Sequence, residues 1–146
     1  MPHISNKKLN DKSFYKIYDQ LISIFDTAGT NRKSNLLLKE FLTETEKIML
    51  AKRLAVVFML YEGVSRYYIS EILLLSPSTV DRISLSYEVG KYPFIASVVK
   101  RNSRTVWNVV EEIIHGEVSK RLGNRRFRWL TEIERKHNRK IFKISK

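Results

Sequence analysis

The sequence has no cysteine, and only five glycines and three prolines among its 146 residues. The absence of cysteine excludes disulfides and thiolate metal ligands. The histidines, His3, His115 and His137, lie far apart and lack the spacing of a helical metal site. A glycine-rich phosphate loop and a carboxylate pair suited to acid–base chemistry are also missing. The sequence therefore favours a binding protein over an enzyme, and we expect no cofactor.

Long apolar runs are missing as well. No run approaches the roughly 20 residues that cross a bilayer as a helix. The first residues, Met-Pro-His-Ile-Ser-Asn-Lys-Lys, lack the apolar stretch of a signal peptide. We therefore expect a cytoplasmic protein with no membrane partner. The apolar content of 43% is still sufficient for the core of one domain.

Acidic residues are few relative to basic ones. The chain has 27 Lys and Arg against 15 Asp and Glu, a formal net charge of +12. Residues 1–90 hold 12 basic and 10 acidic groups, whereas residues 91–146 hold 15 basic and 5 acidic groups. Non-specific affinity for nucleic acid comes mainly from cations that neutralise phosphates. The C-terminal third should therefore supply most of any such affinity.

Residues 64–90 have the pattern of two short helices around a tight turn. Ser65 is a suitable N-cap for the first helix, in which Ile69, Ile72 and Leu73 share one face. Ser76 followed by Pro77 indicates the start of the second helix, and Gly90 its end. The pattern is typical of a helix-turn-helix, whose second helix places its N-terminal residues against base edges in the major groove of DNA.

This interpretation makes double-stranded DNA the expected partner, with helix 76–89 in the major groove. The candidate base-reading residues are Ser76, Pro77, Ser78, Thr79, Asp81 and Arg82. The first motif helix supplies the candidate phosphate contacts Ser65, Arg66, Tyr67 and Ser70. The alternative is two packed helices of an all-α domain without a role in DNA binding, because Ser-Pro caps occur in proteins of every function.

The preceding segment supports the DNA-binding interpretation. Thr43 and Glu46 form a capping-box pattern before a long predicted helix that ends at Gly63. From about Leu37 to Tyr92 the chain resembles the Trp-repressor family, including relatives not known as tryptophan sensors. The resemblance rests on Leu42-Thr43, Glu46, Arg53, Gly63, Ser65, Ile69, Leu73 and the run Ser78-Thr79-Val80-Asp81-Arg82.

The resemblance implies an all-α helical bundle that forms an interlocked homodimer, with one reading helix for each half of a DNA site. In the repressor two arginines hold the indole of the co-repressor, and their positions match Arg53 and Arg82. Beside the second arginine the repressor has a glycine, where this chain has Ile83. Because the Ile83 side chain would fill the indole space, we expect no amino-acid co-repressor and structural roles for the arginines.

The chain also differs from the family on the side that faces DNA. Basic contacts on the first motif helix of the family match the neutral residues Tyr67 and Ser70, and a threonine of its reading helix matches Asp81. A carboxylate accepts hydrogen bonds only from donors such as the cytosine amino group. We therefore expect a sequence preference that differs from the repressor's.

The C-terminal third is predicted to be helical. Apolar residues recur at helical spacing from Phe94 to His115, with a break near Asn102-Ser103 and a stop at Gly116. A basic amphipathic helix is expected from about Asn124 to Arg139, with His137 inward. Its candidate phosphate-binding residues are Arg125, Arg126, Arg128, Arg135, Lys136, Arg139 and Lys140. The alternatives are a solvated basic face and a helix that lies on an anionic membrane.

We expect three segments within one compact unit. They are an N-terminal helical arm at 1–34, with Ser13 as helix cap, a Trp-repressor-like helix-turn-helix domain at 35–92, and a basic C-terminal extension at 93–146. The predicted function is sequence-specific, repressor-like regulation of transcription. The alternatives are a non-specific nucleic-acid-binding adaptor, transposase-related or RNA-binding, and a protein-assembly module that buries the second motif helix against a partner.

Overall fold

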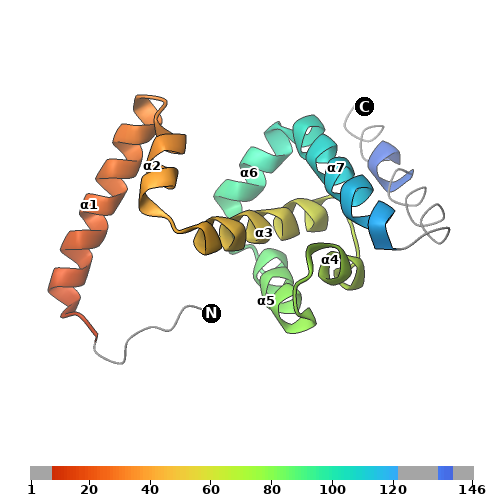
Figure 1. Cartoon of the computed structure of the whole chain (residues 1–146), viewed down its shortest axis with the longest axis horizontal. Coiled ribbons are helices and arrows are strands. Elements are labelled where there is room, and N and C mark those ends of the chain that lie inside the picture. The colour runs from red at the N-terminus through yellow and green to blue at the C-terminus, as the bar shows by residue number, and fades with distance from the viewer. Residues whose placement is uncertain (1–7, 122–134, 140–146) are drawn as a thin grey trace. The chain divides into compact units, whose positions relative to one another are not determined.

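The computed structural model describes residues 8–121 and 135–139. The described residues form helices and their connections, without a strand, which confirms the predicted all-α class for this part of the chain. Residues 135–139 form a helical turn. The helices of residues 8–121 (Figure 1) are α1 (Asp11–Thr30), α2 (Ser34–Phe41), α3 (Glu44–Tyr61), α4 (Arg66–Leu73), α5 (Pro77–Glu88), α6 (Pro93–Arg101) and α7 (Ser103–Arg121).

Backbone contacts group the chain into two units, residues 1–47 and residues 48–146. The first unit contains α1 and α2, which pack against each other. The second contains α4 to α7 and the part of α3 that follows Lys47. The division into segments 1–34, 35–92 and 93–146 stays a prediction.

The N-terminal helix α1 begins earlier than the sequence suggested. Asn10, and not Ser13, is its N-cap, because the Asn10 side chain accepts a hydrogen bond from the Lys12 N–H at 2.9 Å. The helix ends at Thr30. Its large apolar side chains are exposed in the single chain: Phe14, Tyr15, Ile17, Tyr18, Ile22, Ile24 and Phe25.

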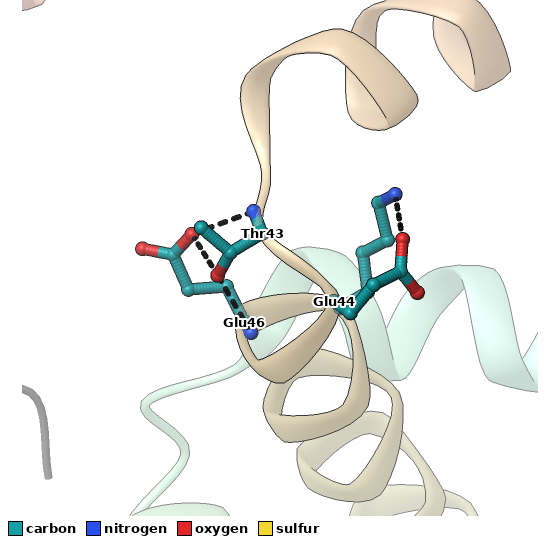
Figure 2. A network of polar contacts seen from close by, with 4 residues as sticks. Thr43, Glu44 and Glu46 are labelled. Atoms are coloured by element: carbon teal, nitrogen blue, oxygen red, sulfur yellow. Dashed lines mark hydrogen bonds and ion pairs between the residues drawn. The ribbon is translucent and has the colours of Figure 1, made fainter.

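The capping box at the start of α3 is confirmed (Figure 2). The Thr43 N–H donates to Glu46 Oε2 at 2.9 Å, and the Glu46 N–H donates to Thr43 Oγ1 at 3.3 Å. The Thr43 hydroxyl also donates to Glu46 Oε2, at 2.7 Å. These hydrogen bonds use backbone donors that the first helical turn leaves without partners, and they lower the pKa of Glu46.

Gly63 ends α3, as the sequence predicted. Its φ of 80° lies in the left-handed region, where a side chain would be strained. The Val64 N–H bonds to the Met59 carbonyl at 2.9 Å and the Gly63 N–H to the Leu60 carbonyl at 3.0 Å. This pair of bonds is a Schellman motif, which satisfies carbonyls that the helix end leaves open. The chain therefore reverses within three residues and enters α4.

The core of the second unit is built by five helices. Buried apolar side chains from each of them form one cluster: Ala55, Val56, Val57 and Met59 of α3, Ile69, Ile72 and Leu73 of α4, Val80 and Ile83 of α5, Val99 of α6, and Val106, Val110 and Ile114 of α7, with Val64 between α3 and α4. Figure 1 shows α3 between the α4–α5 pair and the α6–α7 pair. The expected break at Asn102 is confirmed, since Asn102 is the C-cap of α6.

The stop predicted at Gly116 is wrong, because α7 continues to Arg121. A glycine inside a helix costs about 1 kcal/mol relative to alanine. The buried stripe Val106, Val110 and Ile114 holds the preceding turns of α7 against the core. Among the described glycines the left-handed conformation is found at Gly63 and Gly90 and not at Gly116, so Gly116 does not form a left-handed helix end.

Thr43→Ala should lower the free energy of unfolding by about 1 kcal/mol, because it removes the side-chain half of the capping box. Urea denaturation of the full chain measures this change. Thr45→Ala is the matched control, since Thr45 is exposed in the first turn of the same helix. A Thr43→Ala loss no larger than that of the control would contradict a structural role for the box.

The difference in free energy of unfolding between the wild type and Thr43→Ala should depend on pH. The lowered pKa of Glu46 means that its carboxylate stabilises the fold above the unfolded-state value of 4.5 and loses this effect as pH falls through the folded-state value. The stability gap between the wild type and Thr43→Ala should therefore be larger at pH 7 than at pH 3.

Candidate nucleic-acid interface

The helices α4 and α5 are two short helices joined by a tight turn, at the positions where the sequence predicted two short helices. Ser65 caps α4 by accepting the Tyr68 N–H at 3.5 Å, and Ser76 caps α5 by accepting the Thr79 N–H at 3.3 Å. Pro77 occupies the first position of α5, where a missing N–H costs nothing. Between the helices Leu74 has φ 51°, a left-handed conformation that ends α4. The start and end of both helices are thus set by local residues.

Ser70 does not take the role expected for it. It is only 7% exposed, and its hydroxyl donates to the Leu75 carbonyl at 2.7 Å. The Leu75 N–H in turn donates to the Ser70 carbonyl at 3.1 Å. These two bonds close the turn between α4 and α5. The Ser70 hydroxyl is therefore part of the turn, and we remove it from the candidate phosphate contacts.

The N-terminal part of α5 presents its polar side chains outward. The exposed candidates are Ser76, Pro77, Ser78, Asp81 and Arg82, whereas Thr79 is half-buried. The Ser76 hydroxyl lies 2.8 Å from Thr79 Oγ1 and 3.2 Å from Ser78 Oγ, so the three hydroxyls form a connected group. Ser65, Arg66 and Tyr67 at the start of α4 are exposed as well.

Arg66 joins the start of α4 to two carboxylates of α5. Its Nη2 donates to Glu88 Oε1, and its Nη1 lies 3.5 Å from Asp81 Oδ1. The buried Ser84 hydroxyl also donates to Glu88 Oε1, at 3.3 Å. The hydrogen bond with Glu88, followed by the charges of Glu88 and Asp81, raises the pKa of Arg66. Two candidate DNA contacts, Arg66 and Asp81, therefore face each other in the single chain.

The sequence interpretation missed Glu88, which lies 22 residues from Arg66. The usable signal is its spacing of seven residues from Asp81, which places both carboxylates on one side of α5. Together α4 and α5 carry Arg66 and Arg82 against Glu71, Asp81 and Glu88, an excess of one negative charge. The α4–α5 pair therefore has little electrostatic attraction of its own for phosphates.

The arginines that match the co-repressor site lie in different surroundings from those expected. Arg53 is exposed and forms no ion pair with the described residues, so the structural contact anticipated for it is not found there. Arg82 is exposed on α5, and its neighbour Ile83 is 8% exposed within the core cluster. Ile83 thus fills core volume rather than lining an open site.

The candidate phosphate-binding residues of the C-terminal segment are only partly described. Arg135, Lys136 and Arg139 are exposed on the helical turn 135–139, while Arg125, Arg126, Arg128 and Lys140 lie outside the described residues. The Lys136 Cδ atom lies 3.9 Å from the position that a Cβ atom on Gly63 would occupy. The basic turn is therefore adjacent to the chain reversal that leads into α4.

His137 is buried, as expected, and its partner is Glu62, which the sequence interpretation did not single out. His137 Nδ1 lies 2.8 Å from Glu62 Oε2, and the His137 ring stacks on Trp107 with ring centres 4.1 Å apart. Burial, together with the charge of Glu62, raises the pKa of Tyr61. Burial is also the main cause of the raised pKa of Tyr87, with smaller contributions from Tyr61 and Glu62. The signal in the sequence that could have indicated the partner of His137 was the carboxylate of Glu62 at the end of an apolar helix.

Within the described residues, no cluster of three or more histidine and acidic side chains could hold a metal ion. No helix in the same residues is both long and apolar enough to span a bilayer. Neither a protein-family model, nor a curated protein, nor a solved structure matches the chain.

Ser70→Ala should lower the free energy of unfolding by about 1 kcal/mol, because it removes a buried hydrogen bond and leaves the Leu75 carbonyl without its side-chain donor. Urea denaturation measures the loss. Ser86→Ala, a half-buried serine of α5 with no such bond in the described part of the chain, serves as control. Equal stability of the two variants would show that the Ser70 hydroxyl does not hold the turn.

Proposed function

We propose that the chain is a sequence-specific, repressor-like regulator of transcription that binds double-stranded DNA through a Trp-repressor-like helix-turn-helix. The observation that carries the proposal is the exposed N-terminal part of α5, with Ser78, Asp81 and Arg82 on a helix whose start is fixed by the Ser76 cap. A reading helix needs this combination of a rigid backbone and outward polar groups. Such a regulator acts in the cytoplasm and needs no amino-acid co-repressor.

The side chains at this end of α5 define the expected base contacts. A guanidinium such as that of Arg82 can donate two parallel hydrogen bonds to guanine, and a hydroxyl such as that of Ser78 can bond to several bases. The Asp81 carboxylate can accept from the cytosine amino group. These groups favour a site with G·C pairs at the positions opposite Asp81 and Arg82.

The proposal includes a homodimer, because the described residues of the first unit leave an apolar face of α1 exposed. Ile17, for example, is 59% exposed. Large apolar patches on a soluble chain mark interaction sites. A second copy offers the same face, and dimeric helix-turn-helix proteins bind half-sites about one helical turn of DNA apart.

A second candidate function is a non-specific nucleic-acid-binding adaptor. It is favoured by the excess negative charge on α4 and α5, because phosphate binding would then reside in the basic C-terminal segment alone. The two candidates differ in whether the identity of the bases matters.

Selection of a random duplex library by the full chain at physiological salt tests the proposal. We expect an enriched, two-fold-symmetric site, which Arg82→Ala and Asp81→Asn each relax at one position by about 1–3 kcal/mol. Lys91→Ala is a control that removes an exposed cation beyond the end of α5. Retention of duplexes without enrichment would favour the adaptor, and failure to retain any duplex would reject the proposed regulator.

The dimer has its own test, the mass of the protein in solution by light scattering. We expect twice the 17.2 kDa of one chain. Ile17→Glu should yield the single-chain mass, because it would bury a charge in the apolar contact. Lys16→Glu, at an exposed neighbouring position, should leave the dimer intact. A wild type that stays monomeric at micromolar concentration would contradict this part of the proposal.

A further inference from the structure

A buried acid–imidazole pair joins two parts of the second unit that are 75 residues apart in sequence. Glu62, at the end of α3, is 0% exposed, and His137 is 9% exposed. His137 is the hydrogen-bond partner of Glu62 Oε2, whereas Glu62 Oε1 is buried without a partner in the described residues. Trp107 of α7 covers the imidazole at an angle of 13° between the ring planes.

This pair is a costly way to fill the core. A buried carboxylate loses its hydration, and here one of its oxygens gains no hydrogen bond in exchange within the described residues. Replacement of buried polar pairs by apolar side chains of similar volume is often neutral or stabilising. Stability alone therefore does not explain the pair. What the pair does provide is a directional bond that fixes where the turn 135–139 lies.

The position fixed by the pair is next to the start of the helix-turn-helix. Lys136 lies against the Gly63 reversal, and Gly63 is two residues before Ser65, the N-cap of α4. In a helix-turn-helix the first helix crosses the phosphate backbone. Because α4 and α5 together carry excess negative charge, cations held at this place would supply the attraction that the motif itself lacks.

We propose that Glu62 and His137 are positioning residues for DNA binding. Their bond holds the basic turn 135–139 at the start of α4, so that Arg135, Lys136 and Arg139 contact the phosphates of the same duplex whose bases α5 reads. The inference rests on the proposed DNA-binding function and assigns a specific role to the contact between distant segments.

Glu62→Met tests this assignment and Glu62→Gln is its matched control. Methionine has a similar size but offers no hydrogen-bonding group equivalent to the carboxyl group, so His137 Nδ1 would lose its partner and the turn would be released. Glutamine removes the charge and keeps an oxygen that can accept from His137. Both variants are made in the full chain, and their duplex affinities are measured between about 50 and 200 mM salt.

For Glu62→Met we expect a flatter dependence of log affinity on log salt, by about 0.9 for each phosphate that the turn no longer neutralises, with unchanged base preference in library selection. Glu62→Gln should keep the wild-type slope. The double variant Arg135→Gln/Arg139→Gln should flatten the slope by itself, by about 1.8 if each side chain neutralises one phosphate. A wild-type slope in this double variant would overturn the proposal, even if Glu62→Met failed to fold.

Two readouts that do not involve DNA separate this inference from the proposed function. Stacking on Trp107 should shift the His137 ring protons upfield in NMR spectra, and Glu62→Met should abolish this shift and accelerate tryptic cleavage at Arg135. If these changes occur while the salt slope of Glu62→Met stays at the wild-type value, the Glu62–His137 pair holds the turn but does not serve DNA binding. That result would overturn the proposal. If the wild type binds no duplex at all, the proposed function fails, and the positioning role fails with it.

Discussion

The chain reversal at Gly63 is the constraint on which the second unit depends. The left-handed backbone of Gly63 and the two hydrogen bonds of the Schellman motif stop α3 and return the chain within three residues. Glu62 and Val64, the neighbours of Gly63 in sequence, are both buried, and Ser65 is in position to cap α4. The orientation of α4, and through it the turn to α5, follows from this one short segment.

The proposed function assigns base reading and phosphate attraction to different parts of the sequence. The helices α4 and α5 are held by local caps and by the pairing of Arg66 with Glu88, but their charges nearly cancel. Exposed ion pairs are weak, so phosphates could compete with Glu88 and Asp81 for Arg66. The large basic excess of the chain lies in residues 91–146. Under the proposed function, such a chain would obtain specificity from the nearly neutral α4–α5 pair and affinity from a separate cationic segment.

The features that could be predicted from the sequence are local ones. The capping box at Thr43, the Gly63 stop, the Ser65 and Ser76 caps and the break at Asn102 each depend on a few neighbouring residues, and each is confirmed. Predictions based on one residue type in isolation were less reliable. Gly116 does not end α7, because it does not adopt the left-handed conformation of a helix end, and Asn10 caps α1 in place of Ser13 because it lies one residue before the first helical turn.

Contacts between distant residues were beyond the reach of the sequence. Nothing near Arg66 indicates Glu88, and nothing near His137 indicates Glu62, because these pairs depend on how the helices pack. The same limit explains Ser70, which matched a phosphate contact of the Trp-repressor family but whose hydroxyl bonds to Leu75. For the candidate site, the sequence indicated which residues of α5 are exposed and left open how they are paired.

The central claim is that α5 reads DNA while the basic turn 135–139 contacts the adjoining phosphates. An amide NMR titration of the full chain with a selected duplex tests it most directly. We expect the largest amide chemical-shift changes at Ser78, Thr79, Asp81 and Arg82, accompanied by changes at Arg135 to Arg139. Shifts confined to the basic C-terminal segment, with the N-terminal part of α5 unaffected, would contradict it.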